Sequence, residues 1–149
     1  MKLAIISDSH GNKKAVKYLF DNYQFDYLFY LGDGINDIGS YKYLNNVYVV
    51  SGNCDIFSTD VEERIVELEK NKILVTHGHG YGVKRDLDKL IARGKELNCN
   101  IVLYGHTHNA NYIDIDDMYV INPGALQKGQ GVILTIDDKI SLENIKIDI

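Results

Sequence analysis

The side chains best suited to metal chemistry are concentrated in short segments that follow apolar runs of the chain. All five histidines occupy such positions, and none lies within a helical pattern: His10, His77, His79, His106 and His108. Asp8, Asp33 and Asn53 follow apolar runs in the same way. Oxygen and imidazole donors without thiolate suit Mn²⁺, Fe²⁺ or Zn²⁺ rather than copper(I) or an iron–sulfur cluster. These residue types therefore predict a site for hard or borderline divalent cations.

The number of candidate ligands indicates more than one ion. A structural zinc site closes its shell with four ligands and often includes cysteine. About seven or eight candidate ligands are available here, which is too many for one tetrahedral ion. Two ions roughly 3.5–4 Å apart can clamp an in-line displacement at phosphorus and lower the pKa of a shared water. The residue set therefore predicts a two-metal site that acts on phosphate esters.

The elements that must position these residues begin with strands in the first half of the chain. Apolar runs at 2–6, 27–31 and 47–50 each end in one of the polar segments. Between the first two, Ala15, Val16 and Leu19 recur at helical spacing after a candidate cap, Asn12. This strand–loop–helix alternation predicts a largely parallel sheet. The carboxyl ends of parallel strands lie at one edge of a sheet, so the polar segments should converge there.

The second half of the chain predicts a second sheet. A hairpin is expected from 61–68 and 72–76, a helix over 86–98 and a strand over 101–104. Antiparallel strands are then expected at 111–115, 118–121, 132–136 and 140–147. We therefore predict an α/β fold, a two-sheet αββα sandwich, that forms a single domain over 1–149.

Composition limits the classes of partner. The chain has 149 residues, a formal net charge of −5 and a pI of about 5.4, which disfavours dedicated nucleic-acid binding. No apolar run approaches the roughly 18 residues of a membrane span. Cys54 and Cys99 have no metal-like or disulfide-framework spacing, so a cytoplasmic location is expected. A small phosphate ester is the expected substrate, and homo-oligomerisation stays open.

Taken in order, the polar segments resemble one known family. They are similar to the calcineurin-like metallophosphoesterase superfamily, and most of all to its compact bacterial and archaeal phosphodiesterase branch without a cap domain. The resemblance extends from Asp8 to Gly124. It rests on five segments: Asp8-x-His10, Gly32-Asp33, Gly52-Asn53-x-Asp55, His77, and Gly105-His106-x-His108.

The resemblance implies a ligand assignment and a reaction. One metal would be held by Asp8, His10 and His108, and the other by Asn53, His77 and His106, with Asp33 bridging both. Mn²⁺ is the favoured ion, with Fe, Zn, Ni or Co as alternatives. A metal-bridging hydroxide would attack phosphorus. His106 and His79 are the candidates for a direct catalytic role.

At one position the chain departs from the commoner family pattern. Many members carry a histidine directly after the motif asparagine, and it is their usual candidate general acid. This chain has Cys54 there. Cys54 is interpreted as a buried thiol rather than a catalyst, so protonation of the leaving group is unassigned. Substrates with good leaving groups, or protonation by His79 or a water, are expected.

Three functions are ranked from these observations. A phosphodiesterase comes first, because no basic residue is obviously dedicated to a terminal phosphate dianion. A phosphomonoesterase with the same site comes second. A non-catalytic protein-interaction scaffold resembling the small subunit of retromer comes third, because every expected ligand position is occupied. Alone, Asp33 could be a tight-turn residue and His79 a solvent-facing group, so the prediction depends on the whole set.

Overall fold

In the computed structural model, which describes residues 1–148, alternate residues of β1 (Lys2–Ile6) face two different hydrophobic layers. Leu3 and Ile5 pack into the layer between two sheets, whereas Ala4 and Ile6 pack against the helices on the outer face. Successive side chains of a strand point to opposite faces, so a strand buried on both faces is apolar throughout. The continuous apolar run at 2–6 has this cause.

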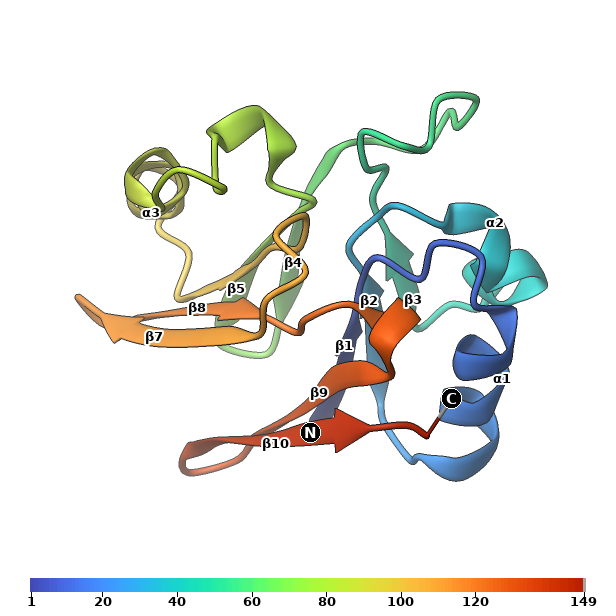
Figure 1. The fold of residues 1–149 in the computed structure, drawn as a ribbon. Coiled ribbons are helices and arrows are strands. Elements are labelled where there is room, and N and C mark those ends of the chain that lie inside the picture. The colour runs from blue at the N-terminus through green and yellow to red at the C-terminus, as the bar shows by residue number, and fades with distance from the viewer. Residues whose placement is uncertain (149) are drawn as a thin grey trace.

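The first sheet has the strand order β10-β9-β1-β2-β3 (Figure 1). The strands β1, β2 and β3 run parallel, and β9 pairs with β1 antiparallel. Their carboxyl ends therefore share one edge, where the first three polar segments begin. The remaining bounds are β2 (Tyr27–Tyr30), β3 (Val47–Val49), β9 (Gln130–Ile136) and β10 (Ile140–Lys146).

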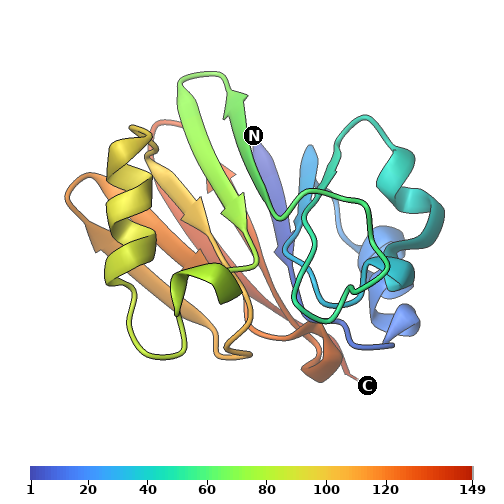
Figure 2. The same cartoon turned by 90° about the horizontal axis from the view of Figure 1, so that it is seen from above.

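The second sheet has the order β4-β5-β6-β8-β7 and packs face to face with the first (Figure 2). The expected hairpins β4–β5, β7–β8 and β9–β10 are antiparallel. However, β8 pairs with β6 in parallel, which the sequence did not predict. The chain reverses direction between β6 and β7 and again between β7 and β8. As a result β8 runs in the same direction as β6, with which it pairs. The bounds are β4 (Glu63–Leu68), β5 (Asn71–Thr76), β6 (Ile101–Leu103), β7 (Asn111–Ile115) and β8 (Met118–Asn122).

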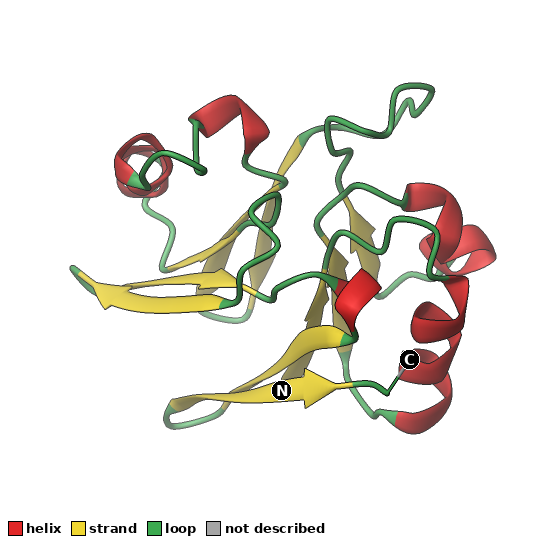
Figure 3. Cartoon of the chain, viewed as in Figure 1, coloured by secondary structure: helices red, strands yellow, loops and turns green. Residues whose placement is uncertain are grey.

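Helices cover the outer faces of both sheets (Figure 3). The first sheet carries α1 (Lys13–Asn22) and the short α2 (Ile35–Ile38), and the second carries α3 (Asp88–Glu96). Asn12 caps α1 as expected, because its side-chain oxygen accepts a hydrogen bond from the Ala15 amide at 3.1 Å. Single turns of 3₁₀ helix occur at Gly39–Tyr43, His79–Tyr81 and Leu126–Lys128.

The predicted αββα sandwich is confirmed. The core between the sheets contains fully buried residues from both, such as Phe29 of β2 and Leu103 of β6. None of the helices in the described part of the chain is long and apolar enough to cross a bilayer.

The β4–β5 hairpin offers a matched test of this core. Ile73 is fully buried between the sheets, whereas Ile65 on the neighbouring strand is 43% exposed. We expect Ile73→Ala to lower the free energy of unfolding by about 2–5 kcal/mol, because it leaves a cavity. Ile65→Ala should cost about 1 kcal/mol or less. Urea denaturation followed by circular dichroism measures both, and equal losses would contradict the assigned faces.

Candidate metal centre

The backbone at the predicted ligands has an uncommon conformation. Five of the nine non-glycine residues with a positive φ in the described chain are predicted ligands. Such angles are unfavourable for residues with a Cβ and persist only where surrounding contacts hold them. The five are Asp8 (54°), His10 (41°), Asp33 (63°), His106 (71°) and His108 (62°).

Hydrogen bonds between the loops hold them together at one end of the sandwich. Within the first sheet, the Asp8 amide donates to the Gly32 carbonyl at 2.9 Å and the His10 amide to the Asp33 carbonyl at 3.2 Å. Across the two sheets, the His106 amide donates to Asp8 Oδ2 at 3.1 Å. The loops of both sheets therefore form one rigid cluster, in which each ligand is positioned by the others.

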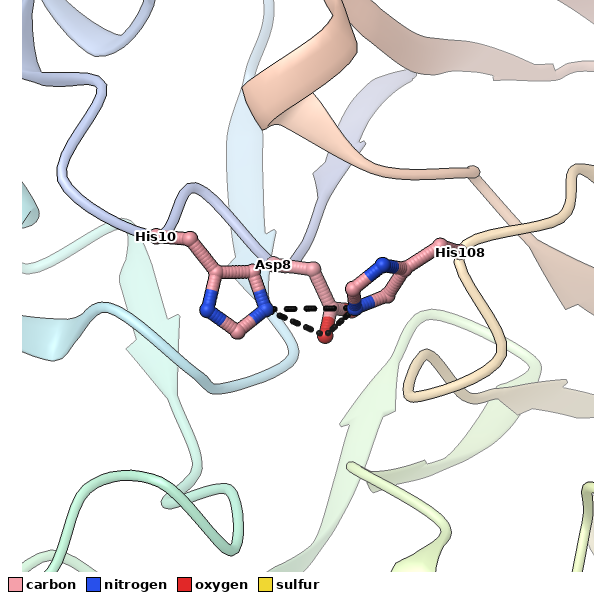
Figure 4. A group of neighbouring side chains, drawn as sticks. All are labelled: Asp8, His10 and His108. Carbon is pink, nitrogen blue, oxygen red and sulfur yellow. Dashed lines mark hydrogen bonds and ion pairs between the residues drawn. The ribbon is translucent and has the colours of Figure 1, made fainter.

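The first group of converging side chains is Asp8, His10 and His108 (Figure 4). The two imidazoles face each other with their Nε2 atoms 3.1 Å apart, and both point toward Asp8 Oδ1, at 3.5 Å from His10 and 3.2 Å from His108. Asp8 is fully buried, and its Oδ1 makes no hydrogen bond to any described residue. A buried carboxylate oxygen without a partner is costly unless a cation satisfies it.

The second group is Asp33, His77 and His106. His77 Nε2 lies 3.3 Å from Asp33 Oδ2 and 3.2 Å from His106 Nδ1. The same Asp33 oxygen is 3.7 Å from His10 Nε2 of the first group. Asp8 Oδ1 in turn lies 3.9 Å from His77 Nε2, so an oxygen of each carboxylate faces the other group, with the Asp33 oxygen slightly closer. Each group supplies one carboxylate and two imidazoles. This donor set fits a pair of divalent cations.

A hydrogen bond outside the cluster selects the tautomer of His77. Its Nδ1 lies 2.6 Å from the Leu31 carbonyl oxygen, which can only accept a hydrogen bond. Nδ1 therefore carries a proton whether the ring is neutral or charged, and Nε2 is the nitrogen that faces Asp33. Nε2 donates to Asp33 Oδ2 when the ring is protonated, and it would offer its lone pair to a bound metal. Fixing the outer nitrogen in this way is a common means of orienting a metal-binding histidine.

The ionisation of the cluster reflects its excess of negative charge. Burial opposes ionisation of Asp33, yet hydrogen bonds from His77 and the Cys54 amide hold the pKa of this carboxyl well below its usual range. Burial also disfavours charged His77, but the Asp33 hydrogen bond and the Asp8 charge raise its pKa overall. Burial, followed by the charge of His77, lowers the pKa of His106. The space between the Asp8 and Asp33 carboxylates therefore favours a positively charged group.

Asp55 fixes the loop that carries Asp33. Its carboxylate accepts hydrogen bonds from the amides of Asp33 at 2.7 Å and of Gly34 and Gly52 at 2.9 Å each. A fourth comes from the Ile35 amide at 3.1 Å. One charged side chain thus joins the segments after β2 and β3 and fixes the backbone that carries Asp33.

A second acidic residue, Asp37 of α2, plays the same part for the loop after β1. Its Oδ2 accepts from Ser9 Oγ at 2.6 Å and from the Gly11 amide at 2.7 Å. The Tyr30 hydroxyl lies 2.7 Å from the same Ser9 oxygen. The sequence analysis missed this group, because an acidic residue in a short polar stretch gives no indication that it is buried.

The glycines beside the ligands are required sterically. A Cβ at Gly105 would collide with Ser7 Oγ and lie 2.7 Å from Asp8 Oδ2. A Cβ at Gly52 would collide with the Asp33 side chain and lie 2.6 Å from the Asp33 backbone nitrogen. The Gly-Asp, Gly-Asn and Gly-His pairs of the sequence therefore reflect the close approach of neighbouring loops.

The other two predicted residues, Asn53 and His79, are more exposed than Asp8, Asp33 and His77. The Asn53 side chain contacts the sulfur of Cys54, 3.7 Å from its Nδ2. Its role as a ligand stays a prediction. His79 lies at the edge of the second group, with its ring centroid 5.5 Å from that of His77, and its Nε2 is 3.7 Å from Glu62 Oε1.

The interpretation of Cys54 as a buried thiol is wrong. Cys54 is exposed, because the chain turns outward after Gly52 and places the residue on the rim of the cluster. Its sulfur lies within 4.8 Å of ligand atoms of His10 and Asp33. Partial desolvation and the negative charge of Asp33 raise the pKa of this thiol, which favours its protonated form.

Comparison with known proteins agrees with this geometry. The family model of the calcineurin-like phosphoesterase superfamily domain matches residues 1–139. A probable metallophosphoesterase of Bacillus subtilis, YsnB, is 32% identical over 85% of this chain and 76% of its own length. Phosphodiesterase MJ0936 of Methanocaldococcus jannaschii is 32% identical, with 83% of each chain covered.

Solved structures share the fold. A predicted phosphoesterase from Streptococcus pneumoniae superposes with a TM-score of 0.88 at 26% identity, covering 97% of this chain and 88% of that one. Vps29 of Entamoeba histolytica shares the fold at 20% identity, with a TM-score of 0.76, 99% of this chain and 100% of that one covered. The resemblance predicted from the ordered motifs is confirmed: the chain belongs to the calcineurin-like phosphoesterase superfamily.

Proposed function

We propose that the chain is a phosphodiesterase that hydrolyses small phosphate esters with two divalent metal ions, Mn²⁺ being the favoured ion. Asp8, His10 and His108 would hold one ion, and His77, His106 and Asn53 the other. The observation that supports this best is the position of Asp33 Oδ2, 3.7 Å from His10 Nε2 and 3.3 Å from His77 Nε2. A single oxygen between two sets of imidazole donors suits a bridging ligand.

The bound ions would supply a water of lowered pKa and positive charge opposite the phosphoryl oxygens. The protein's own residues orient the donors. Ser7 Oγ and the His106 amide both donate to Asp8 Oδ2, which leaves Oδ1 directed at the first group. The Leu31 carbonyl does the same for His77 by accepting from its Nδ1. Donors held in place before substrate arrives need no reorganisation during the reaction.

The leaving group would be protonated by a side chain or a water at the edge of the site. His79 lies 6.2 Å from His106 between ring centroids, which places a second imidazole beside the second metal group. We therefore retain His79 or a water as the proton donor for poor leaving groups. A p-nitrophenolate leaving group needs no such donor, because it is stable as an anion.

Two alternatives are each favoured by one observation. A phosphomonoesterase is favoured by Lys84, whose positive charge reaches the cluster and contributes to the lowered pKa of His106. A protein-interaction scaffold is favoured by the likeness to Vps29, which at 20% identity concerns the fold alone. Because both ligand groups are complete in histidines and carboxylates, we place catalysis ahead of a scaffold role.

Replacement of the bridging carboxylate tests the proposal directly. We expect the protein with added Mn²⁺ to hydrolyse bis(p-nitrophenyl) phosphate, and Asp33→Asn to lower kcat/KM by roughly 10²- to 10³-fold. Release of p-nitrophenolate measures the rate. Asp117→Asn, the same change in the exposed β7–β8 turn, should leave it unaltered. No turnover by the folded wild-type protein with Mn²⁺, Ni²⁺, Co²⁺, Fe²⁺ or Zn²⁺ would refute the proposal.

Substrate charge separates the two kinds of phosphoesterase. We expect a higher kcat/KM for bis(p-nitrophenyl) phosphate than for p-nitrophenyl phosphate, because the monoester dianion has no cation dedicated to its extra charge. The Lys84→Ala variant identifies the role of the one lysine whose charge reaches His106. If the monoester is the better substrate and this variant loses that preference, the phosphomonoesterase alternative is correct.

Asp55 should control metal affinity without contacting the metal. Asp55→Asn removes the charge that holds the Asp33 loop and replaces an accepting oxygen by a donor. We expect the affinity for Mn²⁺ to fall by about 10- to 100-fold, measured by isothermal titration calorimetry. Asp117→Asn again serves as the matched control. An unchanged affinity in a folded Asp55→Asn protein would show that the loop keeps its geometry without this carboxylate.

A further inference from the structure

The loop between β3 and β4 carries two large apolar side chains into solvent. Ile56 is 77% exposed and Phe57 is 94% exposed. Figure 1 shows this loop projecting beyond the ends of the strands, and Figure 2 shows it beside the other strand-end loops. Exposure of an aromatic ring at the rim of a reactive site calls for a functional explanation, because a solvated loop would place polar residues there.

Specific contacts hold the exposed tip in place. Ser51 Oγ donates to Ser58 Oγ at 2.8 Å and to the Asp60 carbonyl at 2.9 Å, which closes the base of the loop. Lys42 forms an ion pair with Asp60, with 2.9 Å between Nζ and Oδ2. The loop is thus fastened on both sides of the tip, and the exposure of Phe57 is part of a defined conformation.

The same loop is attached to the candidate metal centre. The Cys54 amide donates to Asp33 Oδ1 at 2.8 Å, and Asp55 accepts from the amides of the Asp33 segment. Phe57 is the second residue after Asp55. The backbone that carries Phe57 is therefore tied closely to the loop that carries Asp33.

A cavity of about 250 Å³ lies along this loop. Apolar side chains from α2 and from the loop tip form part of its wall, and Asn36 adds a side-chain amide. Its one cation, Lys42, is neutralised by Asp60. Two carboxylates, Asp55 and Asp60, also line the cavity, so it is suited to an uncharged group with polar edge atoms rather than to a second anion. The lining used here is Ile35, Asn36, Lys42, Cys54, Ile56 and Phe57.

We propose that this cavity is the subsite for a planar aromatic substituent of the phosphodiester, an aryl group or a nucleobase, and that Phe57 is its specificity-determining residue. The inference rests on the proposed function, because the phosphate must be held at the adjacent metal centre. Cys54 lines the cavity and its sulfur also lies within 4.8 Å of ligand atoms of that centre, so the two sites adjoin at this residue. Stacking on an aromatic face accepts many different rings, so the subsite selects planarity rather than one substituent.

Binding of two phosphonates to the full-length, Mn²⁺-loaded protein tests this subsite without turnover. Phenylphosphonate and methylphosphonate offer the same anion to the metals, and only the former carries a ring. By calorimetry we expect the wild-type protein to bind phenylphosphonate about 3- to 10-fold more tightly. Phe57→Ala should remove this preference and leave methylphosphonate affinity unchanged, whereas Phe57→Tyr should retain it. Tyr18→Ala, a loss of another exposed aromatic ring on α1, should have no effect.

The outcomes separate the subsite from the metal centre. If methylphosphonate binds but Phe57→Ala keeps the preference for the aryl ligand, the subsite is refuted and the metal centre stands. If neither phosphonate binds the metal-loaded protein, the proposed function fails and the subsite fails with it. Sedimentation of the same variants tests the other occupant, a second copy of the chain. Self-association that depends on Phe57, together with an unchanged preference, would reassign the tip as a protein interface.

Discussion

The structure depends on two buried carboxylates that share one small space with four imidazoles and require compensating positive charge. Asp8 is fully buried and Asp33 nearly so, and an oxygen of each faces histidine nitrogens at 3.2 to 3.3 Å. Such a cluster is unfavourable unless positive charge enters it. The raised pKa of His77 means that this histidine holds a proton more strongly, and the lowered pKa of Asp33 means that this carboxyl keeps its negative charge. A pair of divalent cations would meet the requirement for positive charge more completely, since each donor would then have a partner.

The loops that carry the predicted ligands are held in place by two further carboxylates, which accept hydrogen bonds from the backbone amides of these loops. Asp55 holds the Asp33 loop through three of its amides, and Asp37 holds the loop after β1 through Ser9 and Gly11. These anions are matched by local hydrogen bonds and are therefore stable without a metal. This support acts on the segments that contain Asp8, His10 and Asp33, three of the five predicted ligands with a positive φ. The sandwich provides the edge where the loops meet, and the supporting carboxylates set their detailed geometry.

The sequence predicted the parts of the molecule that depend on local pattern. The apolar run at 2–6 and the capped helix after Asn12 follow from periodicity, and the ordered motifs indicated which side chains converge. It did not predict that β8 lies parallel to β6, because strand pairing depends on the path of the whole chain. It placed Cys54 inside when the turn after Gly52 directs it outward. The support by Asp37 was also missed, because burial of a carboxylate is a property of the assembled loops.

The loop after β3 contacts both the candidate metal centre and the cavity beside it. Asp55 and the Cys54 amide engage the Asp33 loop, while Phe57, two residues further on, projects into solvent. In the proposed subsite, Phe57 would select among ester substituents, and the hydrogen bonds of this loop would place its backbone beside Asp33. The segment that fixes the metal ligand would then also determine which esters reach it.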